Sequence, residues 1–235
     1  MAEFMYADRI PAEILAWGNE LAQIRRDIHQ HPELGFDTSR TCGVIATKLS
    51  EWGVEFDDKL VEGGVIAVVN GNAPGPTVAL RADMDALAMP DESENAWRSE
   101  TSQRCHACGH DGHATIGLGV AKVLMSIKDS LHGTMKLIFQ PAEEGVRGAK
   151  SIVENGHLDG VDYLIGCHVS DKADDDPAVV IPGSHGSLAT TKYDVFFHGV
   201  SAHAGGSPEK GKNVMPAVAT AILNLYGIPR NSAGM

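Results

Sequence analysis

The chain has 235 residues, and its 43% hydrophobic content is enough to build a buried core. Asp and Glu outnumber Lys and Arg by 31 to 19, so the formal net charge at pH 7 is −12. Phosphate backbones and anionic lipid surfaces repel a protein this acidic, which argues against nucleic-acid and peripheral membrane binding. No apolar run approaches the roughly 18 residues of a membrane span, and the first residues do not resemble a secretory signal.

The cysteine count indicates the redox compartment. A chain of this length with four cysteines and no export signal does not suggest a disulfide framework. We interpret the cysteines as reduced thiols or metal ligands and expect a cytoplasmic protein.

Apolar periodicity predicts alternating helices and strands through the first two thirds of the chain. The expected helices cover residues 14–31, 39–52, 112–127 and 149–154, and the expected strands cover 64–69, 77–82, 134–139 and 163–167. The first helix ends before Pro32, because proline disfavours helical geometry in the residue before it. This alternation predicts an α/β fold with a mainly parallel sheet and helices on both faces.

The pattern changes after about Gly186. Residues 190–197 predict a half-exposed strand, and Asn213 could cap a helix that runs to about Tyr226. One strand and one helix cannot form an independent domain. We therefore expect two domains, 1–186 and 187–235, of which the second is cut short.

Three polar clusters each follow a predicted strand. They are Arg81-Ala82-Asp83-Met84-Asp85, Gln140-Pro141-Ala142-Glu143-Glu144-Gly145 and Cys167-His168. In open parallel sheets, ligands bind in a crevice at the carboxyl ends of the strands. The three clusters therefore predict a binding site at this edge of the sheet.

A fourth cluster, residues 105–113, reads Cys-His-Ala-Cys-Gly-His-Asp-Gly-His. Its thiols, imidazoles and carboxylate suit borderline-soft divalent ions such as zinc, with manganese, cobalt or nickel as further candidates. Gly109 and Gly112 permit the tight backbone that turns neighbouring side chains onto one ion. Two alternatives stay open: a buried polar loop that begins a helix, and a thiol redox pair of Cys105 and Cys108.

Glu143 and Glu144 are adjacent carboxylates between Pro141 and Gly145. One could bind a metal while the other takes a proton from a metal-held water. In a regular strand the two would point to opposite faces, so the flanking residues predict an irregular backbone that aims both inward. His168, at the end of a buried strand beside these clusters, is favoured as a further ligand.

The other cysteines and histidines lack such a pattern. Cys42 is expected in the core, and Cys167 is expected to face the interior. Five histidines are interpreted as surface or structural residues: His29, His31, His132, His157 and His185.

Four segments carry a resemblance to a known family: residues 81–87, 106–113, 139–145 and 201–205. In these segments the chain resembles the zinc or manganese amidohydrolases of the aminoacylase and carboxypeptidase G superfamily. Within it, the chain is most similar to the hydrolases of N-acyl and indole-acetyl amino acids. The resemblance implies a zinc-peptidase-like catalytic domain, followed by the start of a smaller α+β lid or dimerisation domain.

The resemblance also implies roles for the matching residues. The implied ligands of two divalent ions, Zn or Mn with Co or Ni possible, are Cys108, His110, Glu144 and His168. Glu143 would be the general base and then the acid that protonates the leaving amine. Asp83 and His113 would orient ligands without binding the metal. His203, in the lid domain, would reach across a dimer and stabilise the tetrahedral oxyanion.

The chain departs from the family in two ways. Cys105 stands where relatives commonly carry Met. Family members are also considerably longer, and their fifth ligand is a late His, whereas no His follows His203 here. We therefore expect a truncated chain.

The predicted function is metal-dependent hydrolysis of an amide between an acyl or aroyl group and an amino acid such as glutamate. The expected partners are a small-molecule N-acyl amino acid and, through the lid domain, a second protomer in a homodimer or heteromer. The alternatives are a catalytically silent metal-binding or interaction module and, less favoured, a thiol redox protein.

Overall fold

The computed structural model describes residues 15–145, 147–169 and 193–228. The chain divides into two compact units, Met1–Ala178 and Val179–Met235, and each is described by itself. The domain boundary that the sequence predicts, between residues 186 and 187, lies outside the described residues.

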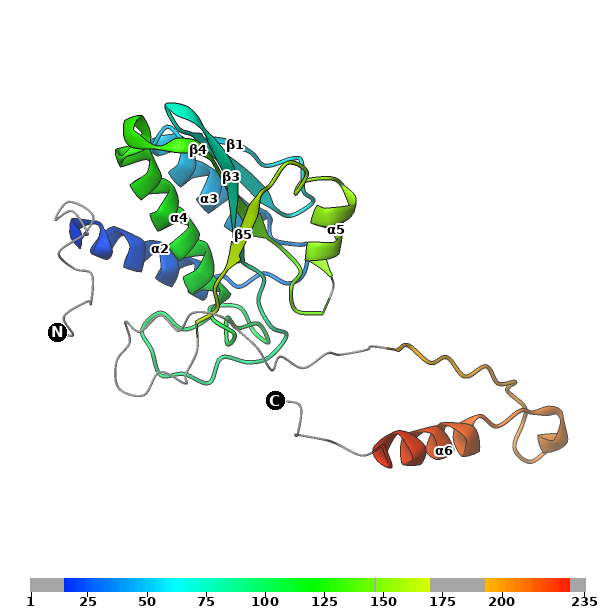
Figure 1. Cartoon of the computed structure of the whole chain (residues 1–235). Coiled ribbons are helices and arrows are strands. Elements are labelled where there is room, and N and C mark those ends of the chain that lie inside the picture. The colour runs from blue at the N-terminus through cyan, green and yellow to red at the C-terminus, as the bar shows by residue number, and fades with distance from the viewer. Residues whose placement is uncertain (1–14, 146, 170–192, 229–235) are drawn as a thin grey trace. The chain divides into compact units, whose positions relative to one another are not determined.

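A five-stranded mixed sheet forms the centre of the first unit (Figure 1). In spatial order its strands are β1 (Glu55–Asp57), β2 (Val65–Asn70), β4 (His132–Gln140), β3 (Ala73–Asp83) and β5 (Tyr163–Gly166). β4, β3 and β5 run parallel to one another, whereas β2 is antiparallel to both β1 and β4. The α/β prediction is confirmed, with the parallel order confined to these three strands. The segment that joins β1 to β2, from Asp57 to Val65, is too short for the crossover connection of a parallel pair, so these two strands are antiparallel.

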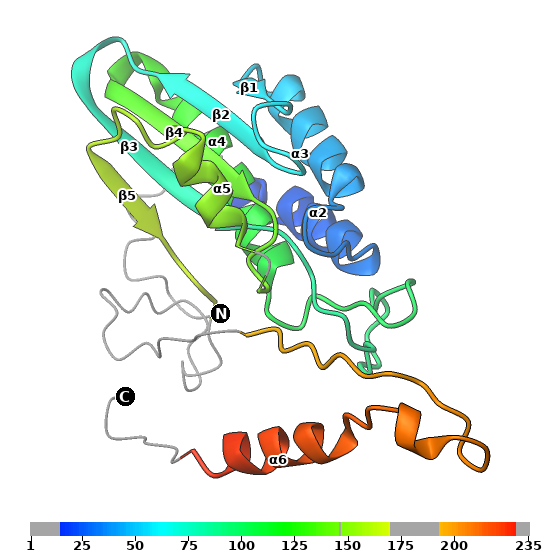
Figure 2. The ribbon, with the colours of Figure 1, turned by 90° about the vertical axis from the view of Figure 1, so that its right-hand side faces the viewer.

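Helices cover both faces of this sheet, as predicted (Figures 1 and 2). On one face lie α2 (Gly18–Gln30), α3 (Ser39–Glu51) and α4 (His110–Ser126), and on the other lies α5 (Gly148–Glu154). Because side chains alternate along a strand, each strand contributes to two apolar layers. Ile28, Leu118 and Phe139 belong to the larger layer, and Ile152 of α5 packs with Ile138 in the smaller one.

The turn between α2 and α3 is fixed by Glu33. Its carboxylate accepts the backbone N–H groups of Arg40 at 3.0 Å and Thr41 at 2.8 Å. These donors belong to the first turn of α3, where the helix itself offers no acceptor. The preceding helix ends at Gln30, as the position of Pro32 predicts.

The parallel strands end together at one edge of the sheet. Asp83 of β3 is in register with Gln140 of β4, and Arg81 is in register with Gly166 of β5. The polar clusters that follow these strands therefore meet at this edge, as predicted.

In the second unit, α6 (Met215–Tyr226) confirms the predicted helix, and Asn213 Oδ1 accepts the N–H of Met215 at 3.0 Å. The predicted strand over 190–197 is wrong for its described residues. Residues 193–197 are exposed and form no strand, because no neighbouring segment pairs with them in the described part of the chain. An isolated bridge joins Val200 and Lys212. None of the described helices has both the length and the apolar character needed to cross a bilayer.

Candidate metal centre

His110 lies at the centre of a polar cluster at the carboxyl edge of the sheet. It is the first residue of α4, and its ring is fully buried. Nδ1 donates a hydrogen bond to the backbone carbonyl oxygen of Asp85 at 2.8 Å, since a carbonyl can only accept. In the neutral ring this contact leaves Nε2 with a free lone pair, the arrangement found in metal-binding histidines.

Three carboxylates surround Nε2 of His110. The nearest oxygen lies at 3.7 Å in Asp83 and at 3.9 Å in both Glu143 and Glu144. These distances are too long for hydrogen bonds. Nε2 of His110 and Oε1 of Glu144 are buried and have no hydrogen-bond partner among the described residues. A buried polar atom without a partner is costly, so these atoms fit a site that a cation completes.

Cys108 and His168 reach the same centre from two other segments. Cys108 precedes α4, and His168 follows β5. Sγ of Cys108 lies 3.4 Å from Nε2 of His168. The possible ligand atoms of Cys108, His110 and His168 all lie within 4.8 Å of one another, and so do those of His110, Glu143 and Glu144. Because His110 belongs to both groups, the structure brings together the four predicted ligands and the predicted base.

Gly109 shapes the backbone between two of these residues. Its φ is +87°, and a Cβ atom here would lie 2.4 Å from Cγ2 of Val169. Only glycine adopts this left-handed conformation without strain and leaves room for the neighbouring chain. The segment between Cys108 and His110 therefore has the tight turn that the sequence predicts.

Asp83 and His113 form a buried pair beside the cluster. Nδ1 of His113 is hydrogen-bonded to Asp83, whose other oxygen lies 2.7 Å from Nη1 of Arg81. Nε2 of His113 accepts the N–H of Val169 at 2.8 Å, next to His168. Both ring nitrogens of His113 are thus engaged, which favours the orienting role over metal binding; that role stays a prediction.

Asp85 holds the two glutamates, a role that the sequence analysis missed. Its fully buried carboxylate accepts the backbone N–H groups of Glu143 at 2.8 Å and Glu144 at 3.0 Å. Ala142 and Gly145 have positive φ, so the predicted irregular backbone is confirmed. The only sequence signal for Asp85 was its place at the end of a strand.

The negative charge of the cluster changes the acidity of its members. Burial, together with Glu144, Glu143 and Asp83, raises the pKa of the Cys108 thiol to about 12. Burial lowers the pKa of His110, but the hydrogen bond to Asp85 and the charges of Asp83 and Asp85 outweigh it, so that pKa is raised. A divalent cation would relieve this crowding, and the sulfur, nitrogen and oxygen donors suit such an ion.

His203, the other predicted catalytic residue, belongs to the second unit. Its Nδ1 accepts the backbone N–H groups of Gly205 at 3.2 Å and Gly206 at 2.9 Å. The neutral ring therefore carries its proton on Nε2, where it can be donated. Its predicted action across a dimer stays a prediction.

Cys167 is exposed, not interior, because β5 lies at the edge of the sheet and all its residues are exposed. His29 is buried, and its Nδ1 lies 2.9 Å from Asp111. His106 is also buried, which lowers its pKa to about 4, and His185 lies outside the described residues.

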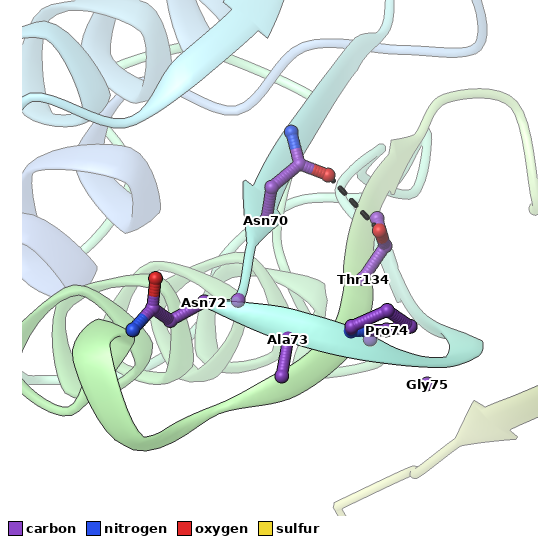
Figure 3. Close-up of a pocket in the computed structure, with 8 residues that line it drawn as sticks. Asn70, Asn72, Ala73, Pro74, Gly75 and Thr134 are labelled. Atoms are coloured by element: carbon purple, nitrogen blue, oxygen red, sulfur yellow. Dashed lines mark hydrogen bonds between the residues drawn. The ribbon is translucent and has the colours of Figure 1, made fainter.

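A surface pocket of about 360 Å³ lies at the opposite end of the sheet (Figure 3). Its lining includes Asn70, whose Oδ1 accepts the hydroxyl hydrogen of Thr134 at 2.9 Å. The eight lining residues include no His, Cys, Asp or Glu. This pocket therefore has no part in the metal centre.

Comparisons with known proteins agree with this geometry. Residues 79–230 match the model of peptidase family M20/M25/M40. The chain is 39% identical over 262 residues to the indole-3-acetyl-aspartic acid hydrolase of Enterobacter agglomerans, a match that covers 92% of this chain and 59% of that protein. It is 38% identical over 250 residues to one subunit of the p-aminobenzoyl-glutamate hydrolase of Escherichia coli K12, covering 99% of this chain and 55% of that protein.

Among solved structures, the fold matches a dinuclear metal-binding peptidase of the M20 family from Bacillus subtilis. The TM-score is 0.65 at 38% sequence identity, over 67% of this chain and 44% of that chain. The chain thus spans little more than half the length of the curated relatives that it matches.

Proposed function

The chain belongs to peptidase family M20/M25/M40. From that premise we propose that it functions as a metal-dependent amidohydrolase that cleaves N-acyl amino acids. The bond cleaved joins an acyl or aroyl group to the amino acid. The observation that carries the proposal is the convergence of thiol, imidazole and carboxylate groups around Nε2 of His110.

In this proposal, Cys108, His110, Glu144 and His168 bind two divalent ions, zinc or manganese with cobalt or nickel as further candidates. Bound there, such ions polarise the scissile carbonyl and lower the pKa of water towards neutrality. Glu144 is suited to the role of metal ligand, because its Oε1 is buried and has no hydrogen-bond partner among the described residues.

Glu143 is the general base of the proposed reaction. Its side chain is 41% exposed, against 22% for Glu144, so it is the more accessible of the two to water and substrate. It takes a proton from the attacking water and passes it to the nitrogen of the leaving amine. Asp83 and His113 orient the ligands beside them. The Nε2–H of His203 reaches across a dimer to the site of the other protomer and stabilises the oxyanion.

The substrate class follows from the relatives and remains part of the proposal. The two curated relatives are named as hydrolases of indole-3-acetyl-aspartic acid and p-aminobenzoyl-glutamate. Both compounds join an aromatic acyl group to an acidic amino acid. We propose p-aminobenzoyl-glutamate or a similar compound as the substrate, and a homodimer or heteromer as the assembly. The free cysteines support action in the cytoplasm, where thiols stay reduced.

The test is hydrolysis of p-aminobenzoyl-glutamate with Zn²⁺ or Mn²⁺, followed as released glutamate, by the wild type and by Glu143→Ala. We expect metal-dependent turnover that the substitution lowers by at least about a hundredfold. Undiminished turnover in the variant would remove Glu143 from the mechanism.

A second candidate function is a catalytically silent metal-binding module. This function needs only the cluster of donor groups around His110, whose possible ligand atoms lie within 4.8 Å of one another in each group. Stoichiometric metal uptake without turnover by the purified chain would support this module over the enzyme. A reversible disulfide between Cys105 and Cys108 would instead support the redox alternative, and metal protection of Cys108 from alkylation would count against it.

A further inference from the structure

A second polar network lies beside the metal centre, where α2 meets the start of α4. Asp111 follows His110 in the first turn of α4, and its side chain is fully buried. Its Oδ2 accepts hydrogen bonds from Nε of Arg25 at 2.6 Å and from Nδ1 of His29 at 2.9 Å. Arg25 and His29 are four residues apart on α2, so they share one helix face.

The same face of α2 also holds the loop that leads to Cys108. Nε2 of His29 lies 3.5 Å from Oδ2 of Asp91. The Asp91 carboxylate accepts the backbone N–H groups of Ser93 at 2.9 Å and Ser99 at 2.8 Å, and so organises this loop. His29 therefore links the loop before Cys108 to the helix that begins with His110.

A buried carboxylate is strongly destabilising unless charged or hydrogen-bonding partners compensate it. Arg25 and His29 supply that compensation for Asp111, and the start of α4 adds the favourable end of the helix dipole. The three side chains thus join the first turn of α4 to α2 at a position next to the proposed ligand His110.

We propose that Arg25 and His29, acting through Asp111, are positioning residues that hold His110 and Cys108 at the spacing a metal requires. This inference rests on the proposed function, because it presumes that these two residues bind metal. Partners that lie one contact beyond the ligands commonly change metal affinity by about 10-fold to 100-fold.

Substitution of Arg25 tests the network with little disturbance of the fold. Its side chain is 40% exposed, while Ile24 and Ile28 supply the buried packing of α2, so Arg25→Gln leaves the core intact. Asp111→Asn preserves shape and removes the charge. The matched control is Asp27→Asn, which breaks an ion pair of α2 with Arg40 at 2.8 Å that does not touch α4.

The experiment titrates the metal-free chain with Co²⁺ and records the sulfur-to-cobalt charge-transfer band, which reports bonding to a thiolate. The same titration of Cys108→Ser assigns the band to Cys108 among the free cysteines. Thermal unfolding is measured in parallel. We expect Arg25→Gln and Asp111→Asn to bind Co²⁺ at least about tenfold more weakly, with an altered band, and Asp27→Asn to match the wild type.

If Arg25→Gln folds, binds Co²⁺ as the wild type does and shows an unchanged band, the network is merely structural and the inference is overturned. This holds even where Asp111→Asn fails to fold, because Arg25→Gln alone decides it. A wild-type chain that takes up no Co²⁺ overturns the proposed metal centre itself, and the inference with it.

Discussion

The buried carboxylate of Asp85 accepts the backbone N–H of Glu143 at 2.8 Å, so the proposed base is held through its main chain. The second oxygen of Asp85 holds Glu144 in the same way at 3.0 Å. One side chain therefore fixes the proposed base and a proposed ligand together, while both glutamate side chains remain available to water and metal.

Asp85→Asn replaces one carboxylate oxygen by an amide NH₂ group, which cannot accept a hydrogen bond from the backbone N–H that faces it. The substitution should therefore disturb the backbone of both glutamates. We expect a loss of about 1–3 kcal/mol in the free energy of unfolding and weaker metal binding. Chemical denaturation and a metal titration measure the two effects. The control is Asp162→Asn, since Asp162 also accepts a backbone N–H, from Thr77 at 2.8 Å, but in an exposed position. Equal effects of the two substitutions would contradict the special role of Asp85.

Gly109→Ala should damage the metal centre more than a comparable glycine substitution elsewhere. Gly109 has φ +87° and a Cβ would lie 2.4 Å from Val169, whereas Gly160 has φ +73° and nothing within 4 Å of such an atom. Gly160→Ala therefore adds only backbone strain, of about 1–3 kcal/mol. Gly109→Ala adds the clash, which moves Cys108 relative to His110. Denaturation and Co²⁺ binding of both variants measure the difference, and unchanged binding in Gly109→Ala would refute this argument.

The sequence predicted the parts of the site that follow from local patterns. Strand ends can be located from apolar runs, and parallel strands bring their ends to one edge, so Asp83, Glu143 and His168 could be placed together. The glycines around Cys108 and His110 indicated a tight backbone, which Gly109 confirms with its positive φ.

The rest depends on contacts that no local pattern reveals. Asp85 gains its role from backbone N–H groups more than fifty residues away in the sequence. The pairing of His29 with Asp111 requires α2 to lie against α4, which periodicity does not specify. The strand predicted over residues 190–197 is an error of another kind, because the sequence predicted an element that its described residues do not form. A β-prone sequence forms no strand without a neighbouring strand to pair with.

Metal affinity should increase steeply with pH. The pKa of Cys108 in the metal-free protein is about 12, so at neutral pH the thiol is protonated and must lose its proton to bind. Apparent affinity should therefore rise by at least about tenfold per pH unit between pH 6 and pH 8, because His110, whose pKa is also raised, must lose its proton as well. These protons are released to the buffer. Calorimetry in buffers of different ionisation enthalpy measures this release. Cys108→Ser should release fewer protons, and equal release would exclude Cys108 as a ligand.

In the metal-free chain, the raised pKa of Cys108 has a second consequence. The native state holds this proton up to pH 12 or so, whereas an unfolded thiol loses it near pH 9. Between these values the native state binds more protons than the unfolded state, so stability falls as pH rises. The denaturation midpoint of the wild type should therefore fall relative to that of Cys108→Ser between pH 9 and pH 12. Parallel profiles would show that Cys108 does not titrate in this way.

His203 and His110 should adopt opposite tautomers in the metal-free protein at a pH where both rings are neutral. Nδ1 of His203 accepts two backbone N–H groups, which leaves the proton on Nε2, whereas Nδ1 of His110 donates to the carbonyl of Asp85. Long-range ¹H–¹⁵N spectra distinguish the two forms, with His203→Gln and His110→Gln to assign the signals. A His203 ring protonated on Nδ1 would turn an acceptor nitrogen outward, and this residue could then not stabilise an oxyanion as a neutral donor.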